Sequence, residues 1–188
     1  HDLQPENVSI CRALSNAQWA QGKKEAATAT AEKALEIAPD DPKVLSLVGG
    51  LFTDMREFAK AVTTLEKALE KDPENADIKF NLANAYLGTG NLDLATGLFI
   101  KSVENDPNDH QALYQLGTIY VQTGNYDGAI EALEKVTSLK PEWARGWETL
   151  SSCYAFKANS TEGDVSKEAY KKSEEALNMF NALTGSGE

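Results

Sequence analysis

The feature that most constrains the fold of this chain is an internal period of 34 residues. Four prolines, Pro39, Pro73, Pro107 and Pro141, are each 34 residues apart. Other columns with the same step are alanine (Ala27, Ala61, Ala95, Ala129), leucine or valine (Leu14, Val48, Leu82, Leu116, Leu150) and aromatic (Phe52, Tyr86, Tyr120, Tyr154). Since independent columns agree, the chain divides into repeats 8–41, 42–75, 76–109 and 110–143, followed by a longer fifth repeat over 144–183.

Within each repeat the hydrophobic pattern predicts two helices. In repeat 110–143, Leu113, Leu116, Gly117 and Tyr120 follow the i, i+3, i+4, i+7 spacing of one helix face. Gly124 then breaks the helix, and a second apolar series leads to the terminal proline. Small residues in the Gly117 and Ala129 columns let the two helices of a hairpin approach closely. The period therefore predicts an all-α fold built from helix–turn–helix hairpins.

Over residues 8–177 the chain resembles the tetratricopeptide repeats. In repeat 110–143 the residues that carry the resemblance are Leu113, Leu116, Gly117, Tyr120, Ala129, Leu133, Val136 and Pro141. The resemblance implies a right-handed α-solenoid of about five repeats, forming one domain over residues 1–184 with a flexible tail at 185–188. It says little about biochemistry, because such repeats serve many unrelated complexes.

The fifth repeat departs from the period, since Ala169 and Ala176 come six residues late. We expect the extra residues to form a polar loop over 159–164, which includes one of two Asn-X-Ser/Thr triplets, at Asn159. The apolar series that follows predicts a helix running to about Leu183. A longer last helix can cover the open end of a solenoid, so we interpret it as a cap.

The resemblance also implies a concave face lined mainly by the first helices of the repeats. The residues it assigns to partner binding are Trp19, Leu47, Phe80, Asn81, Asn84, Leu87, Tyr114, Gln115, Thr118, Val121 and Gln122. Amide side chains both donate and accept hydrogen bonds, and aromatic rings supply contact area, so this face suits an extended or helical apolar segment of a partner. In the alternative interpretation, Phe80 and Tyr114 cover seams between repeats and bind nothing.

The charge of the chain excludes several partner classes. Its net charge is −11, which disfavours nucleic acid and anionic membrane surfaces, and no apolar run is long enough to span a bilayer, so we expect a soluble protein. The predicted concave face has three positive and three negative residues, so the acidity lies elsewhere. Leu47 and Asp77 stand where the family's clamp for the C-terminal carboxylate tail of chaperones requires Asn and Lys. We therefore do not expect a chaperone tail as partner.

The residues needed for catalysis are scarce. His110 is the only interior histidine, it opens a predicted helix as a surface residue, and no metal-ligand spacing surrounds it. Cys11 and Cys153 lie in the first and fifth repeats, too far apart for a disulfide, so we expect both to be packing residues. The sequence thus predicts no enzyme activity, no cofactor and no metal site.

The favoured interpretation is a non-enzymatic scaffold for protein–protein interaction: an adaptor, an assembly factor or a peripheral subunit. One alternative is a recognition region cut from a larger enzyme or secretion-machine protein, which the absence of an initial Met keeps open. A second alternative is self-association. The expected location is the cytoplasm or, if a signal peptide was removed, the periplasm or a lumen.

Overall fold

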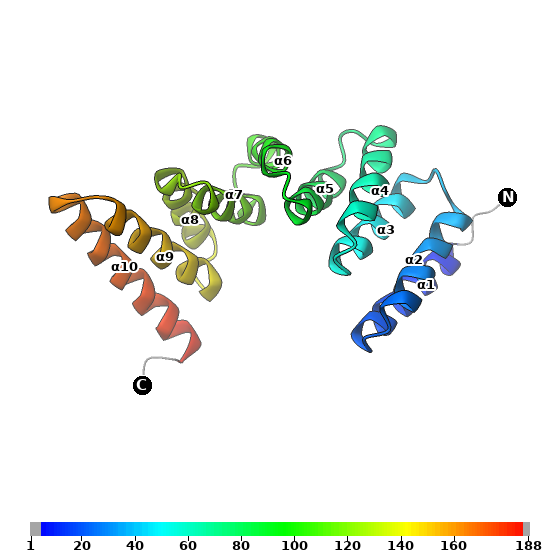
Figure 1. The fold of residues 1–188 in the computed structure, drawn as a ribbon, viewed down its shortest axis with the longest axis horizontal. Coiled ribbons are helices and arrows are strands. Elements are labelled where there is room, and N and C mark those ends of the chain that lie inside the picture. The colour runs from blue at the N-terminus through cyan, green and yellow to red at the C-terminus, as the bar shows by residue number, and fades with distance from the viewer. Residues whose placement is uncertain (1–4, 186–188) are drawn as a thin grey trace. The chain divides into compact units, whose positions relative to one another are not determined.

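The computed structural model describes residues 5–185, and over this range the chain forms ten α-helices and no strand (Figure 1). The helices are α1 (Pro5–Ala20), α2 (Lys24–Ile37), α3 (Pro42–Asp54), α4 (Phe58–Lys71), α5 (Ala76–Thr89), α6 (Leu92–Asn105), α7 (His110–Gln122), α8 (Tyr126–Leu139), α9 (Ala144–Ser160) and α10 (Gly163–Thr184). The predicted all-α architecture is confirmed. The predicted flexible tail after residue 185 lies outside the described residues.

The chain forms two compact units, one ending at Leu98 and the other beginning at Phe99, so the division falls inside α6. The first unit holds the hairpins α1–α2 and α3–α4 together with α5. The second unit holds the hairpins α7–α8 and α9–α10. The expectation of one solenoid domain over residues 1–184 stays a prediction.

Within a hairpin, the small residue of the first helix lies against a large residue of the second. A Cβ atom added at Gly49 would lie 2.4 Å from Leu65 Cγ, and one added at Gly117 would lie 2.7 Å from Leu133 Cγ. Since both distances are shorter than van der Waals contact, only glycine fits these positions without displacing the leucine. The small-residue column of the sequence therefore sets the close approach of α3 to α4 and of α7 to α8.

Polar residues begin the helices where the period places them. Asp41, Asn75 and Asp109 are the N-cap residues of α3, α5 and α7, and each side chain accepts a hydrogen bond from a backbone N–H of the first turn. Between α7 and α8, Gly124 adopts a φ of 76°, which favours glycine, and Asn125 caps the next helix. The turns predicted from the sequence are therefore present.

The fifth hairpin corrects one expectation. Residues 159–164 do not form a polar loop, because α9 continues through Ser160 and α10 begins at Gly163. The six extra residues extend the end of α9 and the start of α10, which have 17 and 22 residues, and only Thr161 and Glu162 connect them. The Ser166 hydroxyl donates to the Ala158 carbonyl over 2.9 Å, which ties the two helix ends together. The end of α10 at Thr184 agrees with the prediction.

The core of each unit is mainly aliphatic, with buried aromatic rings such as Phe52 in the first unit and Phe99 in the second. In the first unit Leu45, Ala68 and Ile78 form a buried cluster. In the second unit the buried cluster includes Leu133 and Cys153, and burial raises the pKa of the Cys153 thiol to about 11. Both cysteines are free, and Cys153 is a packing residue, as predicted.

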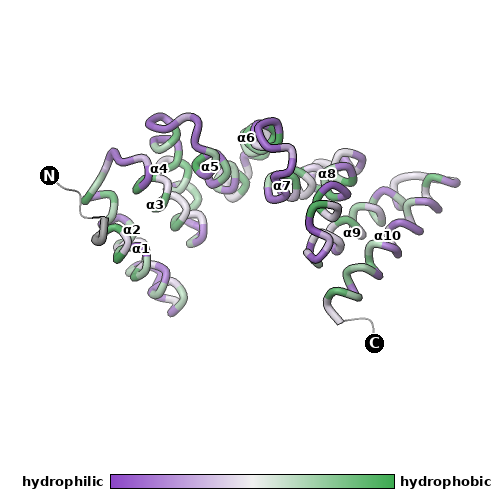
Figure 2. Tube along the Cα trace, turned by 180° about the vertical axis from the view of Figure 1, so that it is seen from behind, coloured by the Kyte–Doolittle hydropathy of each residue, from purple (hydrophilic) through white to green (hydrophobic). Residues whose placement is uncertain are grey.

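Hydrophobic and hydrophilic residues alternate along the length of α10 (Figure 2).

Candidate functional site

In the first unit, the predicted binding residues lie half-buried on three first helices. Trp19 is on α1, Leu47 on α3, and Phe80, Asn81, Asn84 and Leu87 are on α5. A Cβ atom added at Gly50 of α3 would lie only 3.6 Å from the Asn81 amide nitrogen, so Asn81 reaches the neighbouring first helix. Lys24 Nζ lies 5.5 Å from the centroid of the Trp19 ring, within cation–π range.

In the second unit, the predicted residues lie along α7. Gln115, Thr118 and Val121 are half-buried and Gln122 is exposed, whereas Tyr114 is buried, with 9% of its surface accessible. The Tyr114 hydroxyl lies 3.2 Å from Thr149 Oγ1 of α9. Tyr114 therefore joins two successive first helices of this unit.

Trp143 completes an aromatic patch that the sequence analysis did not find. Its ring lies 4.8 Å from the Tyr114 ring and 5.9 Å from the His110 ring, measured between centroids. The guanidinium of Arg145 lies over the Tyr114 ring at 5.5 Å. We call His110, Tyr114, Trp143, Arg145 and Thr149 the aromatic patch. His110 is thus half-buried beside a tryptophan rather than an open surface residue.

The signal for Trp143 was present in the sequence. Asp41, Asn75 and Asp109 occupy the N-cap column, and the next member of that column, 34 residues on, is Trp143. The Trp143 side chain makes no capping hydrogen bond, so α9 lacks the stabilisation of about 1 kcal/mol that a polar cap supplies. Trp143 places a half-buried aromatic side chain where the other repeats have a good capping residue. Such a position is a candidate for partner binding.

The charge within the aromatic patch is open to a ligand. Arg145 is exposed and forms no ion pair with any residue in the described part of the chain. A guanidinium is a planar donor that binds a carboxylate through two parallel hydrogen bonds. The patch can therefore bind a partner side chain through aromatic contact and an anionic or carbonyl group through Arg145.

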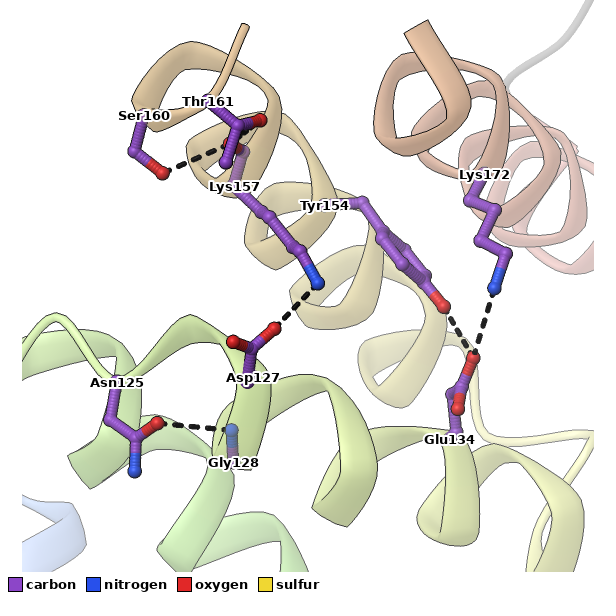
Figure 3. Close-up of polar contacts among 9 residues, drawn as sticks. All are labelled: Asn125, Asp127, Gly128, Glu134, Tyr154, Lys157, Ser160, Thr161 and Lys172. Carbon is purple, nitrogen blue, oxygen red and sulfur yellow. Dashed lines mark hydrogen bonds and ion pairs between the residues drawn. The ribbon is translucent and has the colours of Figure 1, made fainter. Parts of the chain in front are cut away.

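A second set of polar contacts joins successive hairpins away from the aromatic patch. In the first unit, the Tyr86 hydroxyl donates to Glu66 Oε1 over 2.6 Å, and burial, followed by Glu66, raises the pKa of Tyr86 to about 12. In the second unit, the Tyr154 hydroxyl donates to Glu134, whose Oε1 also lies 3.9 Å from Lys172 Nζ (Figure 3). Burial and Glu134 raise the pKa of Tyr154 as well. These contacts are structural, because the groups satisfy one another.

Metal and membrane chemistry find no support in the part of the chain that the structure describes. Among the side chains that the structure describes, no three His, Cys, Asp or Glu are grouped so that they could hold a metal ion. None of the described helices has the length and apolar character needed to cross a bilayer. Enzymatic inactivity stays a prediction from the sequence.

Comparison with known proteins gives a consistent family. Two models described as tetratricopeptide repeat match, one over residues 52–109 and the other over 8–41 and 110–142, together more than half of the chain. No curated protein sequence matches.

Solved structures show the same fold. A MamA crystal structure superposes with a TM-score of 0.75 at 23% identity, covering 98% of this chain and 97% of that one. MamA from Desulfovibrio magneticus RS-1, from residue 41 to its end, has a TM-score of 0.75 at 22% identity, covering 97% of each chain. YrrB, described as a TPR protein with an unusual peptide-binding site, has a TM-score of 0.67 at 23% identity, covering 94% of this chain and 86% of that one. At these identities the likeness concerns the fold.

Proposed function

Because this chain belongs to the tetratricopeptide repeat family, we propose that it is a non-enzymatic scaffold whose first helices hold a segment of a partner protein. The family and its structural relatives support protein interaction as the general role. The peptide-binding site named for YrrB supports a peptide segment as the kind of ligand.

The observation that carries the proposal is the tryptophan at the N-cap of α9. Trp143 stands where Asp41, Asn75 and Asp109 cap their helices, and its ring packs on Tyr114 instead of capping α9. Tryptophan and arginine are the residues most enriched among those that dominate binding energy at interfaces. With Arg145 lacking an ion pair in the described structure, the aromatic patch supplies both kinds of anchor.

The partner segment that fits the aromatic patch has an apolar or aromatic side chain beside a carboxylate or carbonyl group. The amides of Gln115 and Gln122 on α7 both donate and accept hydrogen bonds, which supports recognition of an extended backbone. One arginine does not make a clamp for two carboxylates, so this proposal keeps the exclusion of a chaperone tail.

The test is capture with crosslinking and mass spectrometry in native extract of the source, using wild type and Trp143→Asp. This substitution restores the residue type of positions 41 and 109, so the new cap offsets part of the packing lost with the indole. We expect partner crosslinks on α7 and α9 to disappear. Val165→Ser, on an exposed residue of α10, is the matched control and should keep them. Identical crosslinks from wild type and folded Trp143→Asp would refute the proposal.

A second candidate function, self-association, is favoured by one observation. Ile10 and Leu14 of α1 are 60% and 47% exposed, which is unusual for large aliphatic side chains one turn apart. Light scattering over a range of concentrations tests this candidate. A mass that rises with concentration in wild type, and stays monomeric in Ile10→Ser with Leu14→Ser, supports it, whereas a constant monomer mass in wild type excludes it.

A further inference from the structure

One column of the repeat changes character at a single position in the second unit. The residue twenty positions before each member of the aromatic column Phe52, Tyr86, Tyr120, Tyr154 is, in order, Glu32, Glu66, Ile100 and Glu134. In the fifth repeat the equivalent position, six residues late, is Glu174. Ile100 is thus the one apolar member of a glutamate column, and it is 38% exposed.

This exchange leaves a hydroxyl group without a partner. Tyr86 and Tyr154 donate to Glu66 and Glu134, but the Tyr120 hydroxyl makes no hydrogen bond to any residue between 5 and 185. The ammonium of Lys172 lies near Glu134 and Tyr154, and Ala132 stands at the equivalent position of the fourth repeat. Beside Tyr120, aliphatic side chains therefore replace both the glutamate and the lysine that lie beside Tyr154.

A groove of about 590 Å³ lies at the seam of Tyr120, lined by the second half of α6 and by α7 and α8. The seam of Glu134, Tyr154 and Lys172 borders a hollow of about 510 Å³, so the exchanges change the chemistry of the lining and not the presence of the space. Its floor consists of Ile100, Val103, Leu113, Leu116, Tyr120 and Ala132. The α7 residues among these belong to a different stripe of the helix from Tyr114, Thr118 and Val121. The groove is therefore separate from the aromatic patch and goes beyond the proposed function.

The charge around the groove selects the occupant. Glu104 and Glu131 line it, both are exposed, and neither forms an ion pair with a described residue. Lys135, one helical turn after Glu131, is the one basic lining residue, so the lining carries a net negative charge on a chain of net charge −11. An acidic lining attracts a cationic segment and repels an anionic one.

We propose that this groove is a second interaction surface, which takes an amphipathic segment of a partner protein. The segment places one large aliphatic or aromatic side chain over Ile100 and a Lys or Arg beside Glu104 or Glu131. The Tyr120 hydroxyl donates to a carbonyl of the segment, in place of the glutamate to which Tyr86 and Tyr154 donate. The apolar side chain provides affinity, and the basic residue provides selection.

The experiment uses the full chain and three alanine-rich peptides of about 16 residues, long enough to sample helix. The first carries a Leu pair flanked by Lys, the second has Ser for the Leu pair, and the third has Glu for Lys. Binding is followed by fluorescence anisotropy and by the methyl NMR signal of Ile100. We expect the Leu–Lys peptide to bind about tenfold more tightly than either of the others and to shift the Ile100 signal.

Ile100→Glu separates apolar docking from charge attraction. It adds a negative charge, so attraction alone would strengthen binding of the Leu–Lys peptide. We expect instead a loss of about tenfold, because the new carboxylate fills the groove and takes the Tyr120 hydroxyl. Ile100→Ser, which changes no charge, should lose a similar factor. Leu177→Glu, on an exposed leucine of α10 that does not line the groove, is the matched control and should bind no more weakly than wild type.

Four outcomes would overturn the proposal. In the first, the Leu–Lys peptide does not bind wild type. In the second, the Leu–Glu peptide binds wild type at least as tightly as the Leu–Lys peptide does. In the third, folded Ile100→Glu binds the Leu–Lys peptide as tightly as wild type or more tightly. The fourth is a wild-type dimer that becomes monomeric in Ile100→Glu, which would show that a second copy occupies the groove. Circular dichroism of each variant establishes that it is folded.

Discussion

Two equivalent seams of the second unit differ in chemistry, since one is polar and the other is apolar. At the α8–α9 seam, the Tyr154 hydroxyl, the Glu134 carboxylate and the Lys172 ammonium lie together (Figure 3). At the α6–α7 seam, the same three positions hold Tyr120, Ile100 and Ala132. Both seams border a hollow, of about 510 Å³ at the polar one and about 590 Å³ at the other, so the two side-chain exchanges replace a satisfied polar contact by an apolar lining. A repeat protein can thus create a site without altering its fold, provided that the exchange falls on the exposed edge of a seam.

The largest effect should come from opening the polar seam. Glu134→Ile reproduces the residue of the α6–α7 seam and leaves the Tyr154 hydroxyl half-buried without its acceptor. We expect the free energy of unfolding to fall by about 2 kcal/mol, because losing one partner exposes the desolvation cost of the other. Urea unfolding measures the change. Glu66→Ile is the matched variant in the first unit and should cost about 1 kcal/mol, since no lysine approaches Glu66 within 4.0 Å in the described structure.

Removing one hydroxyl from each seam gives a smaller, sharper comparison. Tyr154→Phe should lower the free energy of unfolding by about 1 kcal/mol, the net value of a hydrogen bond to a charged acceptor that is partly exposed. Tyr120→Phe should change it by less than about 0.5 kcal/mol, because that hydroxyl bonds no described residue. Equal losses at the two positions, measured by urea unfolding, would contradict the distinction between the seams.

The contact between Tyr86 and Glu66, at the corresponding seam of the first unit, should stabilise the fold in a way that depends on pH. Burial and Glu66 raise the pKa of Tyr86 to about 12, above the value of 10.0 for an unperturbed tyrosine. Because the pKa in the folded state is the higher one, this stabilisation is complete below pH 10 and is lost as the pH rises to about 12. The difference in free energy of unfolding between wild type and Tyr86→Phe should therefore be constant at neutral pH and shrink over that range. A stability difference that grows with pH would show that the pKa of Tyr86 is not raised by folding.

The repeat made most of the fold predictable, and the reason is physical. A 34-residue period repeats the same local contacts, so the Gly49–Leu65 and Gly117–Leu133 approaches and the Asp41 and Asp109 caps could be predicted from one column each. The connection after Ala158 could not, because the fifth repeat has no second copy. There Asn159 and Ser160 continue α9, although both residue types are common in loops.

The candidate sites were less predictable for a different reason. Positions such as Tyr114 could be assigned to a face, but whether the ring is open or covered depends on Trp143 and Arg145, which lie about 30 residues away in the chain. Trp143 and Ile100 were both visible as breaks in otherwise regular columns. A break in a column shows that the residue at that position has a different role, and the structure shows which neighbours define that role.

A small effect of opposite sign should come from closing the apolar seam. Ile100→Glu places a carboxylate where Glu66 and Glu134 stand, so it can accept from the Tyr120 hydroxyl. We expect a gain of about 0.5 kcal/mol in the free energy of unfolding, because the new hydrogen bond is offset by repulsion from Glu104, one turn along α6, and by the loss of partly buried aliphatic surface. The gain should vanish in Ile100→Glu combined with Tyr120→Phe, and a gain that persists in the double variant would mean that the hydroxyl is not the group it satisfies. Together with weaker binding of the Leu–Lys peptide, this gain would show that the isoleucine was retained at a cost in stability, which is expected of a binding residue and not of a core residue.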